Sequence, residues 1–181
     1  MVAGAVPAGV IEIRLTKLDQ LFNSLDPAPF HERDLDDDAE EFIVAWAREL
    51  PARAEVQIVV HLPESEVRHA TEQGVTTAFA NYFDYRASVV ERETRELFRM
   101  GWRYLLIGVP VLVACFIASQ LVQTNVGPGP LARALGESFI IVGWVANWKP
   151  IETFLYGWWP LRRRCNLYRR LARATVELRS R

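Results

Sequence analysis

The chain has 181 residues and a formal net charge of −1 at pH 7, which allows one small domain together with a membrane-embedded part. The near-neutral total hides an asymmetry, because residues 1–85 hold 6 Lys and Arg against 16 Asp and Glu, whereas residues 86–181 hold 15 against 6. Such an acidic first half repels phosphate backbones, so no nucleic-acid partner is expected.

Residues 1–85 predict an acidic cytosolic α/β domain. Val10–Leu15 alternates apolar and polar side chains as a strand does, and Lys17–Ser24 predicts a short helix that prolines end. An amphipathic helix is expected over Leu35–Leu50, and Glu55–Leu62 predicts a second strand. This order favours two parallel strands, which need further packing from the long helix that follows or from the strands of a partner.

A long helix is expected over Glu64–Trp102, with Gly74 as the place where it could break. Residues 86–103 are expected to form an exposed juxtamembrane helical stalk, because charged side chains recur there at a spacing of four. The helix is then expected to continue into a transmembrane helix over residues 104–122, which carry no charge and would span roughly 28 Å. The aromatic Tyr104 at its start is typical of the membrane interface.

Residues 123–137 predict a short external loop, and residues 138–161 predict a second transmembrane helix that ends in a pair of tryptophans. Residues 162–181 are expected to follow as a basic cytosolic tail. Arginines are frequent before the first span and after the second but scarce in the loop, so the positive-inside rule places both termini in the cytosol. The alternative, in which the second segment lies on the membrane surface, would leave the basic tail outside.

A short stretch with three polar residues and a proline in the predicted second span forms the candidate functional site. They are Asn147, Lys149, Pro150 and Glu152. A lysine at the centre of a bilayer costs about 2.5–3.5 kcal/mol, and such groups usually face a bundle interior and pair with each other. Lys149 and Glu152 are three residues apart and can form that pair, while Pro150 is expected to kink the helix. Either the kink lines a site for an ion, a proton or a lipid headgroup, or the pair is structural and locks the hairpin or an oligomer.

Two further patterns concern membrane contacts. Gly136, Gly143 and Asn147 recur along one helix face, which favours close packing between helices. The arginines near the end of the chain are candidates for binding anionic lipid headgroups, or act only as a topology signal. They are Arg162, Arg163, Arg164, Arg169 and Arg170.

The sequence contains no recognisable catalytic or metal-binding motif. The acidic run that begins at Asp34 fails as an EF-hand loop, because Ala39 and Ala45 stand where glycine and glutamate are needed, and an acidic helix N-terminus is the simpler interpretation. A divalent-metal site built from His31, Glu32 and that run is the alternative. The two cysteines show no disulfide or zinc spacing. We therefore expect no enzyme activity, no cofactor and no metal.

The chain resembles a group of uncharacterised bacterial membrane proteins in two segments, LFNSLDPAPFHERDLDDDAEEFIVAWAREL over residues 21–50 and GWVANWKPIETFLYGWWPL over residues 143–161. That group has a similar soluble front and a similar W-(K/R)-P-x-E-x-F-L-Y-x-W-W-P ending. The resemblance covers most of the chain and implies a bacterial inner-membrane location without indicating an activity.

The expected function is a non-enzymatic assembly, scaffolding or partner-recruiting role in the bacterial inner membrane. The expected partners are membrane lipids and either further copies of the chain or an unidentified protein. The alternative is an oligomeric transport or channel subunit that uses the pair formed by Lys149 and Glu152. Two spans cannot enclose a pathway, so this alternative requires several copies or a larger partner.

Overall fold

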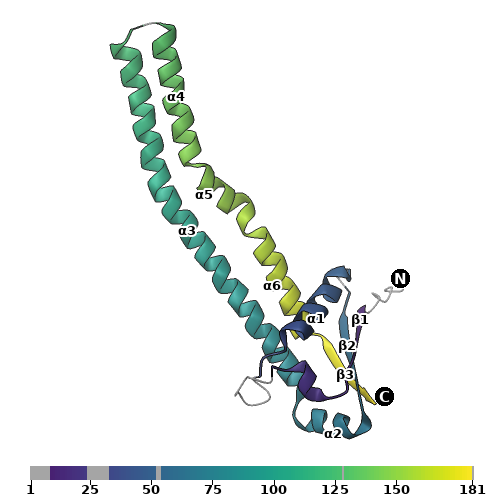
Figure 1. Cartoon of the computed structure of the whole chain (residues 1–181). Helices are drawn as coiled ribbons and strands as arrows, with labels where there is room; N and C mark the ends of the chain where they lie inside the picture. Colours follow the sequence, from purple (N-terminus) through teal and green to yellow (C-terminus); the bar gives the residue numbers. More distant parts are fainter. Residues whose placement is uncertain (1–8, 24–32, 52–53, 128, 181) are drawn as a thin grey trace, which may run out of the picture. The chain divides into compact units, whose positions relative to one another are not determined.

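The computed structural model describes residues 9–23, 33–51, 54–127 and 129–180. The chain is mostly helical, with a small parallel sheet and one long apolar helix (Figure 1). It divides into two compact units: unit 1 comprises Met1–Val90 and Arg163–Arg181, and unit 2 comprises Glu91–Arg162. Unit 1 therefore contains both ends of the sequence.

The sheet of unit 1 has, among the described residues, three parallel strands in the order β1-β2-β3. They are β1 (Gly9–Arg14), β2 (Val56–Leu62) and β3 (Thr175–Ser180). The first two strands and their parallel pairing agree with the sequence prediction, with Ile11 opposite Ile58. The third differs from it, because the end of the predicted basic tail pairs with β2 and Val176 also lies opposite Ile58. The packing that two strands lack thus comes from the end of the same chain.

The burial of each strand follows its place in the sheet. In the edge strand β1, Ile11 and Ile13 are buried whereas Glu12 and Arg14 are exposed, as the alternation predicts. The central strand β2 is buried along most of its length, as is usual for a strand with parallel neighbours on both sides. The sheet therefore has one apolar face against the core of unit 1 and an opposite, polar face on which charged side chains flank the buried Val59.

The helices of unit 1 that precede the apolar segment begin where the local sequence dictates. They are the 3-10 helix η1 (Leu18–Leu21), α1 (Asp37–Glu49), α2 (Glu64–Glu72) and the first part of α3 (Val75–Asn125). The Asp36 carboxylate caps α1 by accepting a hydrogen bond from the Asp38 backbone N–H at 3.1 Å, so the acidic run is a helix N-terminus. Gly74, whose φ is +72°, separates α2 from α3 and confirms the predicted break.

A buried carboxylate, that of Glu40 in α1, joins three helices of unit 1. The hydroxyl groups of Tyr82 in α3 and Tyr168 in α6 (Trp159–Ala172) donate hydrogen bonds to it at 2.5 and 2.8 Å. Arg86 forms an ion pair with the same carboxylate at 3.0 Å. The pKa of Tyr82 is raised, mainly by burial and to a smaller extent by the hydrogen bond to Glu40. Tyr82 therefore contributes fully to stability below the ordinary tyrosine pKa of about 10, and loses this contribution only as the pH rises beyond it.

Aromatic side chains fill the core around this network. Phe22, Phe79 and Phe83 are fully buried, and the rings of Phe22 and Phe79 meet edge to face with their centroids 6.4 Å apart. The Phe83 ring stacks on that of Tyr168 at 6.2 Å, which packs α6 against α3 within unit 1. The end of the sequence is thus part of the core of this unit as well as of its sheet.

Helix α3 runs for 51 residues without a break and passes Pro110, which confirms that the long helix continues into the first apolar segment. It is the one helix, among the residues that the structure describes, that is long and apolar enough to cross a membrane. At 1.5 Å per residue it measures about 75 Å, whereas a bilayer core is about 30 Å thick. Only part of α3 can therefore lie in a membrane.

The predicted second transmembrane helix over residues 138–161 is not a single helix. The region instead contains α4 (Pro130–Ala146), α5 (Trp148–Glu152), the π-helical turn η3 (Thr153–Gly157) and the start of α6. The Asn147 backbone N–H donates to the Trp144 carbonyl at 3.0 Å, which ends α4. Pro150 lacks the N–H that would bond to the Ala146 carbonyl, so the regular helix stops close to the predicted kink.

Candidate functional site

The helices α3 and α4 of unit 2 form an antiparallel hairpin with a tightly packed seam. A Cβ atom built on Gly143 would lie only 3.2 Å from the Cβ of Cys115 and 3.3 Å from the Cα of Leu112. One built on Gly136 would lie 3.1 Å from the hydroxyl oxygen of Ser119. Both glycines are buried, so the predicted stripe of small residues is the surface through which the helices pack.

Asn147 belongs to this seam. Its side-chain amide donates hydrogen bonds to the carbonyls of Gly108 in α3, at 2.9 Å, and of Gly143 in α4, at 3.0 Å. Asn147 is only 6% exposed, and a Cβ on Gly108 would lie 2.7 Å from its side-chain oxygen. Of the four residues predicted as one site, Asn147 therefore joins the two helices to each other.

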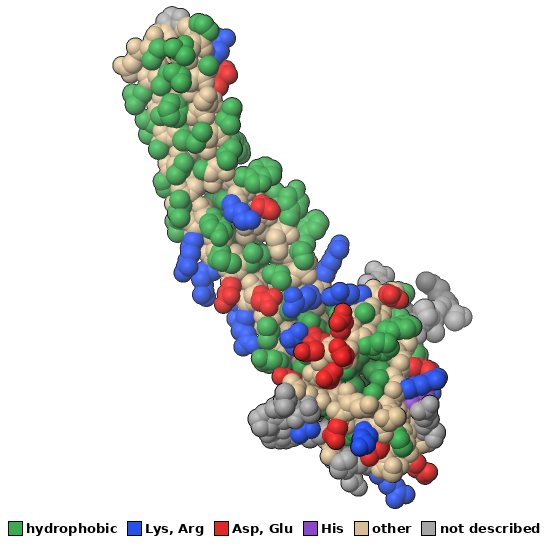
Figure 2. Space-filling model, in the orientation of Figure 1, with side chains coloured by type: hydrophobic (Ala, Val, Ile, Leu, Met, Phe, Trp, Pro, Cys, Tyr) green, Lys and Arg blue, Asp and Glu red, His purple; other side chains and the backbone are tan. Residues whose placement is uncertain are grey.

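The outer surface of the hairpin is apolar. The exposed side chains of α3 include Leu106, Ile107, Val113, Phe116, Ile117 and Leu121, and those of α4 include Leu131, Ile140, Ile141, Val142, Trp144 and Val145. Figure 2 shows hydrophobic side chains spread over the surface of this hairpin. Small and polar groups are buried between the helices while large apolar groups face outward, which is the reverse of the arrangement in a water-soluble helix pair.

The contacts along the seam fix which parts of the two helices lie level with each other. A Cβ on Gly101 would lie 3.0 Å from the Phe154 ring, and that ring contacts Trp102 with centroids 5.8 Å apart. The residues after the break therefore lie opposite residues 97–104 of α3. The charged residues Lys149 and Glu152 are consequently level with the start of the apolar segment of α3, and the middle of that segment lies opposite α4.

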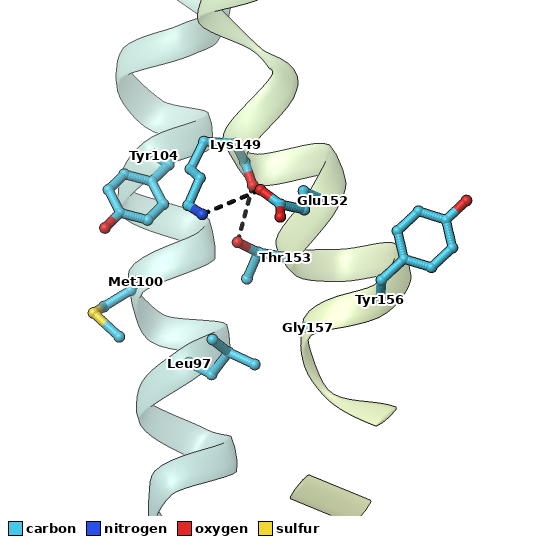
Figure 3. A pocket seen from close by; sticks show the side chains of 8 residues that line it. All are labelled: Leu97, Met100, Tyr104, Lys149, Glu152, Thr153, Tyr156 and Gly157. Carbon is cyan, nitrogen blue, oxygen red and sulfur yellow. Dashed lines mark hydrogen bonds and ion pairs between the residues drawn. The ribbon is translucent and has the colours of Figure 1, made fainter. Parts of the chain in front are cut away.

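A pocket of about 370 Å³ opens beside the break (Figure 3). Leu97, Met100 and Tyr104 of α3 line one wall, and Lys149 and Glu152 line the other together with residues of η3. The Lys149 ammonium group lies 3.1 Å from the Glu152 carboxylate, so the predicted ion pair is present. Their side chains are 65% and 48% exposed, so this pair faces the surroundings of the hairpin.

Further hydrogen bonds hold the irregular backbone beside this pocket. The Thr153 hydroxyl donates to the Lys149 carbonyl at 2.9 Å, and the Trp158 indole N–H donates to the Phe154 carbonyl at 3.1 Å. The bond from the Thr153 hydroxyl adds to the hydrogen bond that the Lys149 carbonyl accepts from the Thr153 backbone N–H. Both side chains thus bind to the backbone of this irregular segment. The pocket thus combines an ammonium group, a carboxylate and an apolar wall.

The five arginines predicted to contact lipid headgroups have different surroundings. They are Arg162, Arg163, Arg164, Arg169 and Arg170. The guanidinium group of Arg162 lies 5.4 Å from the centre of the Trp158 ring, and that of Arg164 lies 5.9 Å from the centre of the Tyr168 ring. Arg170 donates to backbone carbonyls, and the other two are exposed. The first of the five belongs to unit 2 and the remaining four belong to unit 1.

Within the described residues, no group of three or more His, Cys, Asp or Glu side chains is arranged to hold a metal ion. Of the alternative divalent-metal site, His31 and Glu32 lie outside the described residues. On the polar face of the sheet, the buried ring nitrogen Nε2 of His61 lies 3.7 Å from a carboxylate oxygen of Glu12.

Replacing Gly143 by cysteine is expected to create a disulfide with the native Cys115. The distance of 3.2 Å between the two Cβ positions is close to the roughly 3.5–4.5 Å found across disulfides, so a small shift suffices. The variant would be oxidised in membranes with Cys165 replaced by alanine, then denatured, alkylated and weighed. Val142→Cys, at an exposed position of α4, is the matched control and should keep a free thiol. Free thiols in both variants would contradict the seam.

Comparison with known proteins gives no family assignment. No protein-family model matches the chain, and neither does any curated protein or solved structure. The resemblance to bacterial membrane proteins therefore stays a prediction, and the proposed function rests on the geometry of unit 2.

Proposed function

We propose that this chain is a non-enzymatic membrane protein in which the α3–α4 hairpin crosses the bilayer and unit 1 serves as a module for assembly or for recruiting a partner. The observation that supports the hairpin most directly is the apolar outer surface on both helices around a small and polar seam. Water would not stabilise such a helix pair, whereas hydrocarbon solvates its outer surface.

The limits of the membrane-embedded part follow from the register of the two helices. We propose that it comprises residues 104–125 and 130–147, since these segments lie opposite each other in the seam. Helix α4 measures about 26 Å, close to the roughly 30 Å of a bilayer core. This choice moves the second span toward the loop by several residues, relative to the sequence prediction.

In this register, Lys149 and Glu152 lie at the level of the membrane interface. They line a pocket together with Tyr104, and tyrosine is frequent at the membrane interface. The residue before Tyr104 in the sequence is the charged Arg103. A charged pair at that level avoids most of the cost of about 2.5–3.5 kcal/mol that a lysine incurs at the bilayer centre. The pocket is therefore suited to a lipid headgroup.

The orientation that we propose places unit 1 and both chain ends in the cytosol of a bacterium, at its inner membrane. Arginines are frequent on the side of the hairpin where it joins unit 1, whereas the tip carries only Arg133. The positive-inside rule favours the cytosolic side for the arginine-rich end.

The orientation predicts opposite labelling of two engineered cysteines in a variant without Cys115 and Cys165. Thr124→Cys, exposed near the tip, should react with a membrane-impermeant maleimide on intact spheroplasts. Ser180→Cys, exposed in β3, should react only after the membrane is opened. The chain should also stay in the membrane fraction at alkaline pH. Labelling of both cysteines from the same side, or release by alkali, would contradict a hairpin that crosses the membrane.

A transport or channel subunit is the second candidate, and the exposure of the charged pair is the observation that favours it. In a single chain, Lys149 and Glu152 open to the surroundings, so only further copies or another protein could enclose them in a pathway. Ion flux through proteoliposomes separates this candidate from an assembly role.

A further inference from the structure

A second concave site lies within unit 1, where α6 ends and strands β2 and β3 begin. Its volume is about 650 Å³. The polar and charged side chains that line it are those of Glu55, Asn166, Arg169, Arg170, Arg173 and Thr175. Three guanidinium groups thus share one pocket with a single carboxylate, which gives the pocket a strong preference for anions.

The sequence brings these side chains together through the period of the helix. Asn166, Arg169 and Arg170 stand at positions i, i+3 and i+4 of α6, so they share one face, and Arg173 follows directly after the end of the helix. The opposite side of the helix holds the buried Cys165, Tyr168 and Leu171, which pack in the core. The arginines therefore lie away from the core and along the wall of the pocket.

One of the three guanidinium groups is held in place by the backbone. Arg170 Nε donates to the Ala54 carbonyl at 3.0 Å, and its Nη2 donates to the Pro51 carbonyl at 2.8 Å. A guanidinium group has five N–H donors, and these two bonds leave three of them for other acceptors. Because its position is fixed beforehand, little conformational entropy would be lost when Arg170 binds a ligand.

Arginines near a helix C-terminus are also favourable by themselves, since they compensate the negative end of the helix dipole. The helix dipole does not explain, however, why Arg173, Asn166 and Thr175 line the same pocket. The convergence of three guanidinium groups with an amide and a hydroxyl group instead matches a tetrahedral oxyanion, which accepts several hydrogen bonds at once.

We propose that this pocket binds a phosphate group, carried either by a membrane lipid or by a small soluble phosphate compound. Arg169 and Arg173 would supply charge from the exposed wall, Arg170 would donate from its fixed position, and Asn166 and Thr175 would complete the contacts. The site goes beyond the proposed function, since it needs neither the hairpin nor the charged pair beside it.

The test is isothermal titration calorimetry, in which inorganic phosphate is titrated into the full chain held in nanodiscs of phosphatidylcholine. The double variant Arg169→Gln/Arg173→Gln is expected to weaken saturable binding about tenfold or more, because two charge-assisted contacts are lost. The matched control is Arg163→Gln/Arg179→Gln, which removes the same charge from exposed positions of unit 1 outside the pocket. Circular dichroism of each variant establishes folding, and the single variants replace the double one if it unfolds.

The source of the phosphate is distinguished by repeating the titration in nanodiscs that contain phosphatidylglycerol. Competition by the anionic lipid would identify a lipid headgroup as the ligand, whereas unchanged binding would identify a soluble compound. The proposal is overturned if phosphate does not bind saturably to the wild-type chain, or if the control variant loses as much binding as the pocket variant. Either result leaves the membrane topology untouched, because the cysteine labelling of the hairpin is read independently.

Discussion

Glu40→Ala is expected to lower the free energy of unfolding of unit 1 by about 3 kcal/mol, because removing one member of a buried network leaves its partners uncompensated. Tyr82 and Tyr168 would lose the acceptor of their hydrogen bonds, and Arg86 would lose its ion pair. The Arg86 side chain is 35% exposed and can regain water, so the loss should fall at the lower end of the range for buried pairs.

The measurement is urea-dependent hydrogen exchange of unit 1 in the solubilised full chain. Glu41→Ala is the matched control, since it removes the same charge from the next residue, which is exposed. Glu40→Gln should lie between the two, because it keeps an acceptor oxygen but loses the ion pair. Equal destabilisation by Glu40→Ala and Glu41→Ala would mean that the network contributes little.

The sequence predicts this network poorly because Glu40 is hidden in a run of carboxylates. Residues 34–41 contain six acidic side chains, and the simplest interpretation treats them all as a solvated helix N-terminus. That interpretation is correct for Asp36, which caps α1. It misses Glu40, whose burial depends on tyrosines 42 and 128 residues further along the chain. Local charge patterns contain no information on such distant partners.

The same limit explains the missed third strand. Short alternation predicted β1, and a glycine predicted the break before α3, since both signals are local. The segment Thr175–Ser180 also alternates, with Val176 and Leu178 between polar residues, but it follows a run of arginines that is typical of a cytosolic tail. Its parallel partner Ile58 is more than a hundred residues away, and only the folded chain reveals the pairing.

The proposed second membrane segment lies nearer the loop than the span predicted over residues 138–161, and the reason is physical as well. Tryptophans and arginines are typical of the membrane interface, and those at the end of this segment place the end of the predicted span at residue 161. The register of the hairpin is set instead by Gly108, Gly136 and Gly143, where the helices approach most closely. The glycine stripe was visible in the sequence, but its partner positions on α3 were not.

Gly143→Ile is expected to destabilise the hairpin by about 3 kcal/mol, mainly by overpacking the seam. A Cβ at this position would lie 2.8 Å from a methyl carbon of Leu112, which can rotate away, and 3.3 Å from its Cα, which cannot. A branched side chain adds atoms beyond the Cβ, so α4 must move away from α3. That movement also stretches the hydrogen bond from the Asn147 amide to the Gly108 carbonyl, now 2.9 Å long.

The loss of stability is measured by thermal unfolding of the full chain in nanodiscs, with hydrogen exchange of unit 2 as the readout. Gly143→Ala should cost less, because a methyl group meets Leu112 and Cys115 but adds no atoms beyond the Cβ, so the series Gly, Ala, Ile should be graded. The neighbouring substitution Val142→Ile adds one methylene on the exposed face and should change stability little. If Val142→Ile were as disruptive as Gly143→Ile, the outer face of α4 would be the packed one, which would contradict the seam.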